Sequence, residues 1–471
     1  MKTKLLENTV IYTIGNFLTK FIQFLLLPIY TYTLSASELG KFDLYNSIVL
    51  VLIPIITLQI SDGVFRNLID ESNINQKIKI TTNSIFGLFL NIGASLVVLV
   101  TVVLVTSRIE FNGELILWMV FLVLNIVFIY FQSLSRGLGK NKIFAFSGFI
   151  NAIVMGLTAL YFLIILDTGY FGLVIATIVS FSVSILFVAI GIQFFKLIDF
   201  KKIDFSVYKA LLAYSAPLVP NFLSWWIINM SDRLLVNYFL GTSELGIYSI
   251  AYRLANILLF ATTVFNLAWQ ESAILSFNSS EKNSYYSQVF NNYFKFLFSS
   301  IMILITAFPF IIGLFSESYH EAIFLIPYLL FSVAFSAFSS FFGSAFQSSK
   351  NTKEALSSSL IAGITNILLN ITLLPLIGLV GAVISTMLSF LIMWIYRVVQ
   401  TKKYFKISYD FKEISVLIIL NIIFFLSYFV DLSVWLKSGM VFVALFIFVY
   451  MNKKLFLNIL ERIMVRKRGI Q

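Results

Sequence analysis

Long apolar runs separated by short polar breaks dominate the chain. A helix that spans a membrane needs about 20 mostly apolar residues. Fourteen runs of this kind can be read between the breaks, and each predicts one spanning helix. Their approximate bounds are 10–33, 44–65, 80–106, 115–135, 144–166, 171–195, 209–239, 246–275, 291–315, 322–347, 355–376, 379–400, 413–430 and 434–452.

The composition agrees with an all-α polytopic membrane protein of about 14 transmembrane helices. Hydrophobic residues make up 59% of the chain and charged residues only 12%, about half the charged share of a soluble domain. The connections are too short to form a domain outside the bilayer, which argues against a membrane polymerase, ligase or glycosyltransferase. The start, Met1 to Val10, is too polar and the following run too long for a cleaved signal peptide.

Two pairs of segments show an internal duplication. GLVIATIVSF at 172–181 and GAVISTMLSF at 381–390 share six of ten positions at an offset of 209. LSASELG at 34–40 and LGTSELG at 240–246 recur at an offset of 206. Two matches at nearly one spacing indicate a duplicated unit, and duplicated bundles in membranes are typical of transporters.

The repeat divides the chain into two lobes of six helices and a trailing pair. The predicted bounds are 1–195, 196–406 and 407–471, with 196–209 as the linker between the lobes. Each lobe has an even number of helices, so both share one orientation. We therefore expect an axis along the membrane normal and a binding site between the lobes.

The distribution of Lys and Arg predicts the orientation. With both termini cytoplasmic, 27 of the 33 Lys and Arg residues, Arg397 among them, fall in cytoplasmic segments. The net charge of +11 is therefore explained by topology, and no nucleic-acid partner is expected. Cysteine is absent, which excludes disulfides and thiolate chemistry. The single histidine, His320, is interpreted as a loop residue.

Polar residues form stripes at helical spacing on the first two helices of each repeat. Converging between the lobes, such stripes would line a hydrated cavity, whereas the alternative is hydrogen bonding between packed helices. The stripes contain Thr9, Thr13, Asn16, Lys20 and Gln23; Gln59, Asp62 and Arg66; Asn221, Ser224, Asn229 and Asp232; and Ser249, Arg253, Asn256, Thr263, Asn266 and Gln270.

The charges within these stripes are the sharper signal, because a Lys or Arg at mid-bilayer costs roughly 2.5–3.5 kcal/mol. Lys20 and Arg253 lie deep, with Arg66 at the cytoplasmic mouth, and together they favour an anion such as phosphate. Asp232 and Arg253 lie at similar depth and could instead form a structural ion pair. A cation-coupled exporter would need carboxylates without cationic partners, for which only Asp62 and Glu271 are candidates.

Nothing in the sequence indicates an enzyme. No phosphate-binding loop, metal-ligand cluster or catalytic triad is present, and no cofactor is expected. All seven prolines fall in the apolar runs, where each removes a backbone hydrogen bond and bends its helix. The pair Pro217 and Pro220 is the strongest candidate for a bend that allows movement.

Five segments carry a resemblance to a known family. They are LPIYTYTLSASELGKFD at 27–43, DGVFR at 62–66, PLVPNFLSWW at 217–226, the pair Asp232–Arg233, and GIYSIAYR at 246–253. In order and spacing they resemble the bacterial oligosaccharide-lipid flippases (Wzx-type polysaccharide biosynthesis proteins). The superfamily also contains multidrug and toxin extrusion transporters and peptidoglycan-precursor flippases. The resemblance extends over nearly the whole chain.

The resemblance implies alternating access and a cationic cavity that takes the diphosphate and sugars of a polyprenyl-linked repeat unit. It implies a bacterial plasma-membrane location, an H⁺ or Na⁺ gradient, and a polysaccharide polymerase and assembly proteins as partners. Coupling carboxylates would be Asp62 and Glu271. The expected substrate-binding residues are Lys20, Arg66, Arg253, Asn16, Gln23, Asn221, Asn229, Asp232, Tyr252 and Asn256.

Two alternatives remain open at this point. An ion-coupled exporter of drugs or small metabolites is disfavoured by the basic character of the deep charges. A non-transporting scaffold for polysaccharide assembly would need no buried charges.

Overall fold

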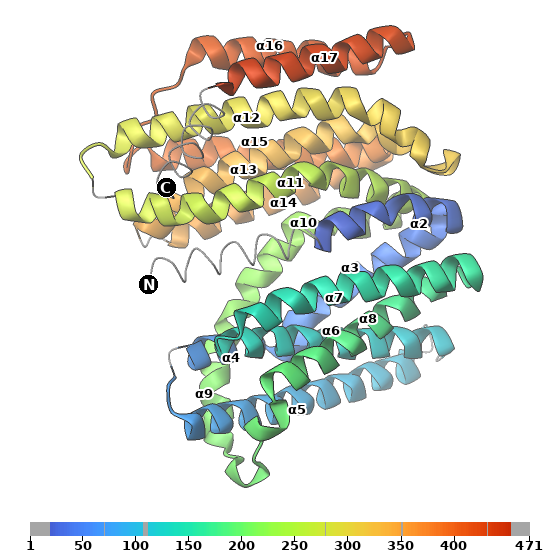
Figure 1. Cartoon of the computed structure of the whole chain (residues 1–471), viewed down its shortest axis with the longest axis vertical. Helices are drawn as coiled ribbons and strands as arrows, with labels where there is room; N and C mark the ends of the chain where they lie inside the picture. The colour runs from blue at the N-terminus through green and yellow to red at the C-terminus, as the bar shows by residue number, and fades with distance from the viewer. Residues whose placement is uncertain are drawn as a thin grey trace, which may run out of the picture. The chain divides into compact units, whose positions relative to one another are not determined.

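The computed structural model describes residues 19–69, 71–106, 112–277, 279–349, 352–430 and 432–453, and all regular structure within these ranges is helical (Figure 1). The α-helices are α2 (Leu27–Thr33), α3 (Ala36–Thr57), α4 (Ile60–Ile69), α5 (Ile74–Thr106), α6 (Gly113–Gly137), α7 (Asn141–Leu160), α8 (Gly169–Ile192), α9 (Phe205–Ser215), α10 (Val219–Leu240), α11 (Thr242–Ser276), α12 (Lys282–Ile311), α13 (Ile326–Ser348), α14 (Thr352–Ile377), α15 (Leu379–Thr401), α16 (Phe411–Tyr428) and α17 (Val434–Met451). Short helical turns are η1 (Tyr161–Ile165), η2 (Phe194–Leu197), η3 (Phe200–Lys202), η4 (Ala216–Leu218), η5 (Ile312–Leu314) and η6 (Glu317–Leu325).

The chain is an all-α polytopic membrane protein. Among the described residues, 12 helices are long and apolar enough to cross a membrane. Two of the predicted runs are not among them. The run 10–33 lies partly outside the described residues, and 209–239 is divided into α9 and α10.

The division between α9 and α10 follows from proline chemistry. Pro217 lies in the short turn η4, where the α-helical hydrogen-bond ladder is interrupted, and Pro220 lies at the start of α10. Proline has no backbone N–H and clashes with the preceding turn of a helix. The run predicted as one helix is therefore two helices that meet at the Pro217 and Pro220 pair, and movement at this point stays a prediction.

The second predicted run, 44–65, is wrong as a single helix. Ser35 and Glu38 form a reciprocal capping box that starts α3 earlier, at Ala36. Leu58 and Gln59 both adopt left-handed backbone angles, with φ of 48° and 56°, which separates α3 from α4. Side chains disfavour this region because Cβ crowds the backbone. Gln59 therefore does not share one helical face with Asp62 and Arg66, as its spacing predicted.

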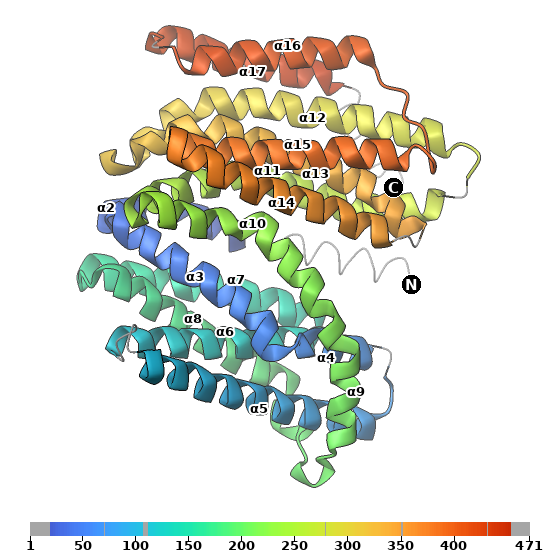
Figure 2. The same cartoon turned by 180° about the vertical axis from the view of Figure 1, so that it is seen from behind.

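The chain forms two compact units, residues 1–246 and 247–471. In the first unit α3 packs beside α10, as Figure 2 shows, α4 packs against α6 and α9, and α8 packs against α6 and α7. In the second unit α15 packs against α13 and α14, and α12 carries the trailing pair α16 and α17. The division at 195 and 406 that the repeat suggests stays a prediction.

A pair of asparagines repeats the same hydrogen bonds in both units. In the first unit the Asn83 amide donates to the Lys202 carbonyl at 2.9 Å, and its oxygen accepts from the Asp204 N–H at 2.6 Å. In the second unit the Asn291 amide donates to the Ser408 carbonyl at 2.9 Å, and its oxygen accepts from the Asp410 N–H at 3.2 Å. Both asparagines lie near the start of a long helix, and both acceptor segments immediately precede a new helix. The connections before α9 and α16 are therefore held by equivalent hydrogen bonds, as a duplicated chain would have them.

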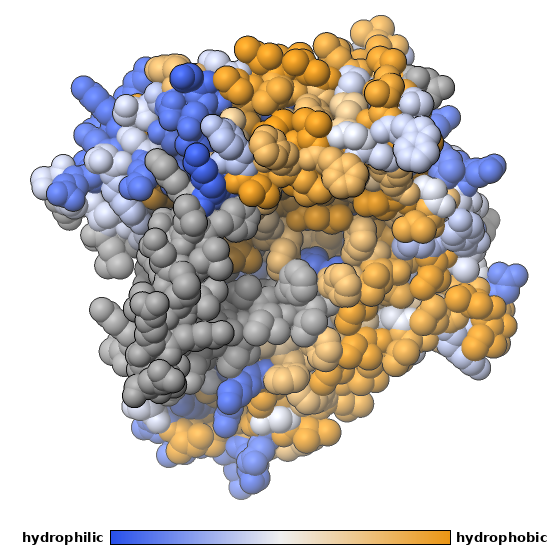
Figure 3. Space-filling model, turned by 45° about the horizontal axis from the view of Figure 1, so that its top comes forward, coloured by the Kyte–Doolittle hydropathy of each residue, from blue (hydrophilic) through white to orange (hydrophobic). Residues whose placement is uncertain are grey.

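The trailing pair combines a polar anchor with an apolar surface. Asn421 of α16 donates to the Phe298 carbonyl of α12 at 3.1 Å, and Asn452 after α17 donates to Ser299 at 3.0 Å. On the other faces of the pair, Ile419, Ile423 and Phe446 are among the exposed hydrophobic side chains. Hydrophobic side chains dominate this part of the surface in Figure 3. Lipid is the solvent that fits such a surface.

Candidate functional site

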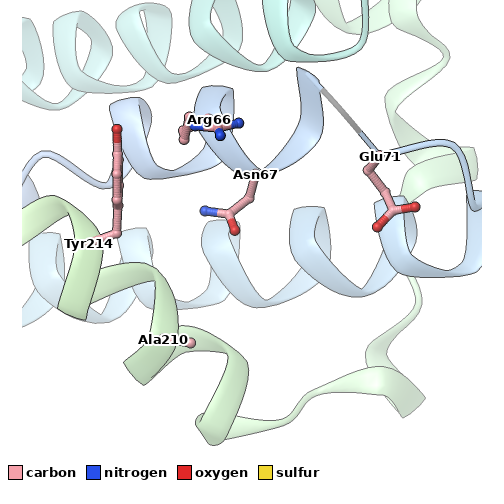
Figure 4. Close-up of a pocket in the computed structure, with 5 residues that line it drawn as sticks. All are labelled: Arg66, Asn67, Glu71, Ala210 and Tyr214. Atoms are coloured by element: carbon pink, nitrogen blue, oxygen red, sulfur yellow. The ribbon is translucent and has the colours of Figure 1, made fainter.

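Arg66 lines a depression at one end of the first unit. The depression has a volume of about 440 Å³ and is lined by Arg66 and Asn67 of α4, Glu71 after it, and Ala210 and Tyr214 of α9. Figure 4 shows these side chains around one space, with Asn67 between Tyr214 and Glu71. The packing of α4 on α9 brings them together. Only Arg66 was expected from the sequence, because the contact between α4 and α9 joins segments that are far apart in the chain.

Asp62 lies one turn before Arg66 but in a different environment. Its carboxyl is half-buried, and Arg136 of α6 is its charged neighbour. The Arg136 guanidinium also lies 4.5 Å from the centre of the Phe65 ring, a cation–π distance. A role for Asp62 in ion coupling stays a prediction, and the described geometry gives it a structural neighbour of opposite charge.

Lys20 and Gln23 lie together on the first described helical turns. The Lys20 ammonium donates to the Gln23 side-chain oxygen at 3.2 Å, and both side chains are exposed. The shared face that their spacing predicted is confirmed for this pair. Asn16, the third member of the expected site on this helix, lies outside the described residues.

α10 carries two adjacent buried charges, Asp232 and Arg233, and Arg233 forms an ion pair with a residue of α3. The Arg233 Nε donates to the Asp43 carboxylate of α3 at 3.0 Å, and both side chains are about 7% exposed. Asp232 is also buried. Sequence reasoning missed Asp43, although an arginine in an apolar run needs a carboxylate partner. The available signal was the position of Asp43 in a predominantly apolar segment, three residues after the LSASELG motif.

The remaining expected residues lie on α10 and α11. Tyr252, Arg253 and Asn256 of α11 are half-buried. Asn221 and Asn229 lie on α10 and Glu271 on α11, but the structure does not describe their side chains. Asp232 and Arg253 belong to different units, so their pairing stays a prediction.

The repeated LSASELG and LGTSELG motifs contact each other within the first unit. A Cβ atom on Gly40 would lie 1.8 Å from the Thr242 carbonyl oxygen, and one on Gly246 would lie 1.9 Å from the Ala36 carbonyl oxygen. Ser37 and Thr242 also share a hydroxyl hydrogen bond of 2.8 Å. The start of α3 thus crosses the start of α11 with backbones in contact, and the two glycines occupy equivalent positions. Small residues four apart allow such close crossings in membranes.

Arg397 is a second buried cation among the described residues. The charge distribution assigns it to a cytoplasmic segment, but it lies inside α15 and is 5% exposed. Its guanidinium donates to the hydroxyls of Ser358 and Ser359, at 2.9 and 3.3 Å, and to the Ser339 carbonyl at 2.8 Å. Oxygen acceptors on α13 and α14 therefore hold it. The serines clustered at 357–359 were the available signal.

Other chemistry is sparse in the described part of the chain. No group of three or more His, Cys, Asp or Glu residues there could hold a metal ion. His320 lies in the turn η6, where its Nε2 is 3.1 Å from the Phe315 carbonyl oxygen. A local hydrogen bond of this kind suits a structural residue.

The fold is similar to those of solved transporters of the MOP superfamily. It is similar to the inward closed conformation of the lipid II flippase MurJ, at 16% identity over 96% of this chain and 100% of that one, with a TM-score of 0.70. It is also similar to an inward-facing multidrug resistance MATE family transporter of the MOP superfamily, at 14% identity over 82% and 95% of the two chains, with a TM-score of 0.66. A MOP superfamily transporter from Pyrococcus furiosus Vc1, described as having a binding pocket of reverse polarity, matches at 14% identity over 84% and 96%, with a TM-score of 0.59.

The profile of the family described as "Polysaccharide biosynthesis protein" matches residues 5–270. The chain belongs to this family, and its fold is similar to those of solved membrane transporters. The family resemblance seen in the sequence is therefore confirmed. No curated protein sequence matches the chain.

Proposed function

We propose that this protein is a flippase that moves a polyprenyl-diphosphate-linked oligosaccharide across the bacterial plasma membrane by alternating access. The observation that carries the proposal is membership of the polysaccharide biosynthesis family over residues 5–270. Similarity of the fold to a lipid II flippase, which by its name moves a lipid, supports a lipid-linked substrate.

The proposed architecture is two six-helix lobes and a trailing pair, with both termini cytoplasmic. Lys20, Arg66 and Arg253 contact the diphosphate or acidic sugars, because guanidinium and ammonium groups donate hydrogen bonds to phosphate. Asn16, Gln23, Asn221, Asn229, Tyr252 and Asn256 contact sugar hydroxyls. An H⁺ or Na⁺ gradient drives the cycle, with Asp62 or Glu271 as the coupling carboxylate.

Rescue of a bacterium that lacks its own oligosaccharide-lipid flippase tests the proposal. Surface polysaccharide is measured for the wild type, Lys20→Ala and Arg253→Ala, with membrane expression of each confirmed. Lys412→Ala is the matched control, because Lys412 is an exposed cation at the start of α16. We expect rescue by the wild type and the control, and loss in the other two variants.

Two results would contradict the proposal. Failure of the wild type in several hosts with different repeat units would favour a small-molecule exporter, which should instead confer drug resistance. Normal surface polysaccharide in a strain that carries Lys20→Ala and Arg253→Ala together would contradict the proposed role of these two cations in binding the substrate.

A further inference from the structure

The depression lined by Arg66, Asn67, Glu71, Ala210 and Tyr214 combines several kinds of recognition chemistry in one place (Figure 4). Its volume of about 440 Å³ falls within the usual size range of small-molecule sites, about 300–1,000 Å³. It lies entirely within the first unit. Of its lining residues, the proposed flippase site includes Arg66 alone.

Hydrogen bonds within the first unit hold the polar groups in place. The Asn67 amide nitrogen donates to the Gly63 carbonyl at 2.8 Å, which leaves the side-chain oxygen as the acceptor for a ligand. The Glu71 carboxylate accepts from the Asn73 N–H at 2.7 Å through one oxygen. A site that is ordered before binding loses less entropy when its ligand arrives.

The aromatic ring of Tyr214 and the small side chain of Ala210 suit a ligand ring with one apolar face. Tyr214 is 46% exposed and contributes a flat apolar surface with a hydroxyl at its edge. Ala210, one turn earlier on α9, adds only a methyl group. A sugar ring presents C–H bonds on its face and hydroxyls around its rim, so it matches an aromatic face bordered by an amide and a carboxylate.

The charges of Arg66 and Glu71 indicate which kind of sugar the depression fits. Arg66 is exposed on α4, and its planar guanidinium donates hydrogen bonds in a geometry that fits phosphate oxygens. Glu71 repels a second anion but accepts hydrogen bonds from hydroxyl or N-acetyl groups. The site therefore fits an uncharged sugar that is bonded directly to a phosphate.

We infer that this depression binds the first sugar of the lipid-linked head group, an uncharged hexose or N-acetylhexosamine, while Arg66 contacts the adjacent diphosphate. The inference rests on the proposed flippase function and adds the sugar at the reducing end as a recognised element. It places this recognition at the end of the first unit where α4 and α9 meet.

Native mass spectrometry of the purified protein tests the inference with three lipids: undecaprenyl diphosphate, the same lipid carrying one N-acetylglucosamine, and phosphatidylglycerol as an ordinary phospholipid. We expect the wild type to bind the sugar-bearing lipid about tenfold more tightly than undecaprenyl diphosphate, and phosphatidylglycerol more weakly than either. Tyr214→Ala and Glu71→Ala should each reduce the preference for the sugar. Arg66→Gln should weaken binding of both diphosphates equally and keep the preference.

Tyr238→Ala is the matched control, because Tyr238 is 80% exposed on α10 and does not line the depression. Equal binding of the two diphosphate lipids by the wild type would overturn the inference and leave the flippase proposal standing. Failure to bind either diphosphate lipid would overturn both. A preference for the sugar that survives Tyr214→Ala together with Glu71→Ala would place sugar recognition elsewhere.

Discussion

The crossing of α3 and α11 at Gly40 and Gly246 gives a sharp prediction about stability. Gly40→Ala places a methyl group 1.8 Å from the Thr242 carbonyl oxygen and 2.8 Å from the Gly246 nitrogen. Ordinary Cβ contacts begin at 3.4 Å, and both obstructing atoms belong to the backbone. The helices must separate, because no side chain can rotate away.

The magnitude follows from two opposing effects. Overpacking a tight contact costs about 1–3 kcal/mol and sometimes more. Gly→Ala in an unobstructed helix instead stabilises the fold by about 0.4–1 kcal/mol, because the unfolded chain loses freedom. Gly93 of α5 lies in open space, where an added Cβ atom would have no neighbour within 4 Å. Gly93→Ala therefore isolates the second effect.

Thermal unfolding of the purified variants in detergent, followed by size-exclusion fluorescence, measures the difference. We expect Gly40→Ala and Gly246→Ala each to lower Tm by roughly 2–12 °C relative to Gly93→Ala, from about 1–3 kcal/mol at about 2–4 °C per kcal/mol for a unit of this size. The double variant should lose less than the sum of the single losses, because the first substitution already separates the helices. Tm values for Gly40→Ala and Gly246→Ala at or above that of Gly93→Ala would refute the tight crossing.

Three further predictions concern single side chains. Asp43→Asn should lower the free energy of unfolding by about 3–5 kcal/mol, because it leaves Arg233 buried beside a neutral group; chemical denaturation should show recovery when Asp43→Leu is combined with Arg233→Met. Arg397→Lys should cost about 1–3 kcal/mol in the same assay, since one ammonium cannot reach all three oxygen acceptors, and an unchanged midpoint would contradict this role. The Lys79 ammonium and the cap to Ser206 hold the pKa of the Asp204 carboxyl at about 2, below its usual 3.8, so this pair stabilises the fold above pH 3.8 and loses its effect as pH falls towards 2. As pH falls from 3.8 towards 2, the Tm of the wild type should therefore decline more than the Tm of Asp204→Asn. An identical decline in both proteins would contradict this role of the Asp204 carboxyl.

Local patterns were sufficient for much of the fold. An apolar run long enough to cross a membrane is a property of adjacent residues, so the helices from α5 to α8 could be located from the sequence. The Pro217 interruption was also local, because proline lacks a backbone donor wherever it stands. Family membership followed from motifs that are contiguous in the chain.

Contacts between distant segments were beyond such reasoning. Arg233 indicates a need for a carboxylate, but its spacing cannot select Asp43, which lies 190 residues away. The left-handed pair Leu58 and Gln59 contains no glycine to indicate it, so the polar spacing across it was misread as one helical face. Asn83 and Asn291 look like ordinary polar residues until their acceptor segments are known.

The distance in sequence between Asp43 and Arg233 also orders events during synthesis. At about 5–20 residues per second, a ribosome completes α10 roughly 10–40 s after α3. During that interval the Asp43 carboxyl is held in a nascent bundle that lacks Arg233, although a charge inside a spanning helix costs up to roughly 2.5–3.5 kcal/mol. The arrival of α10 brings Arg233 to this carboxyl, and so the ion pair between α3 and α10 forms only after about half of the chain has been synthesised.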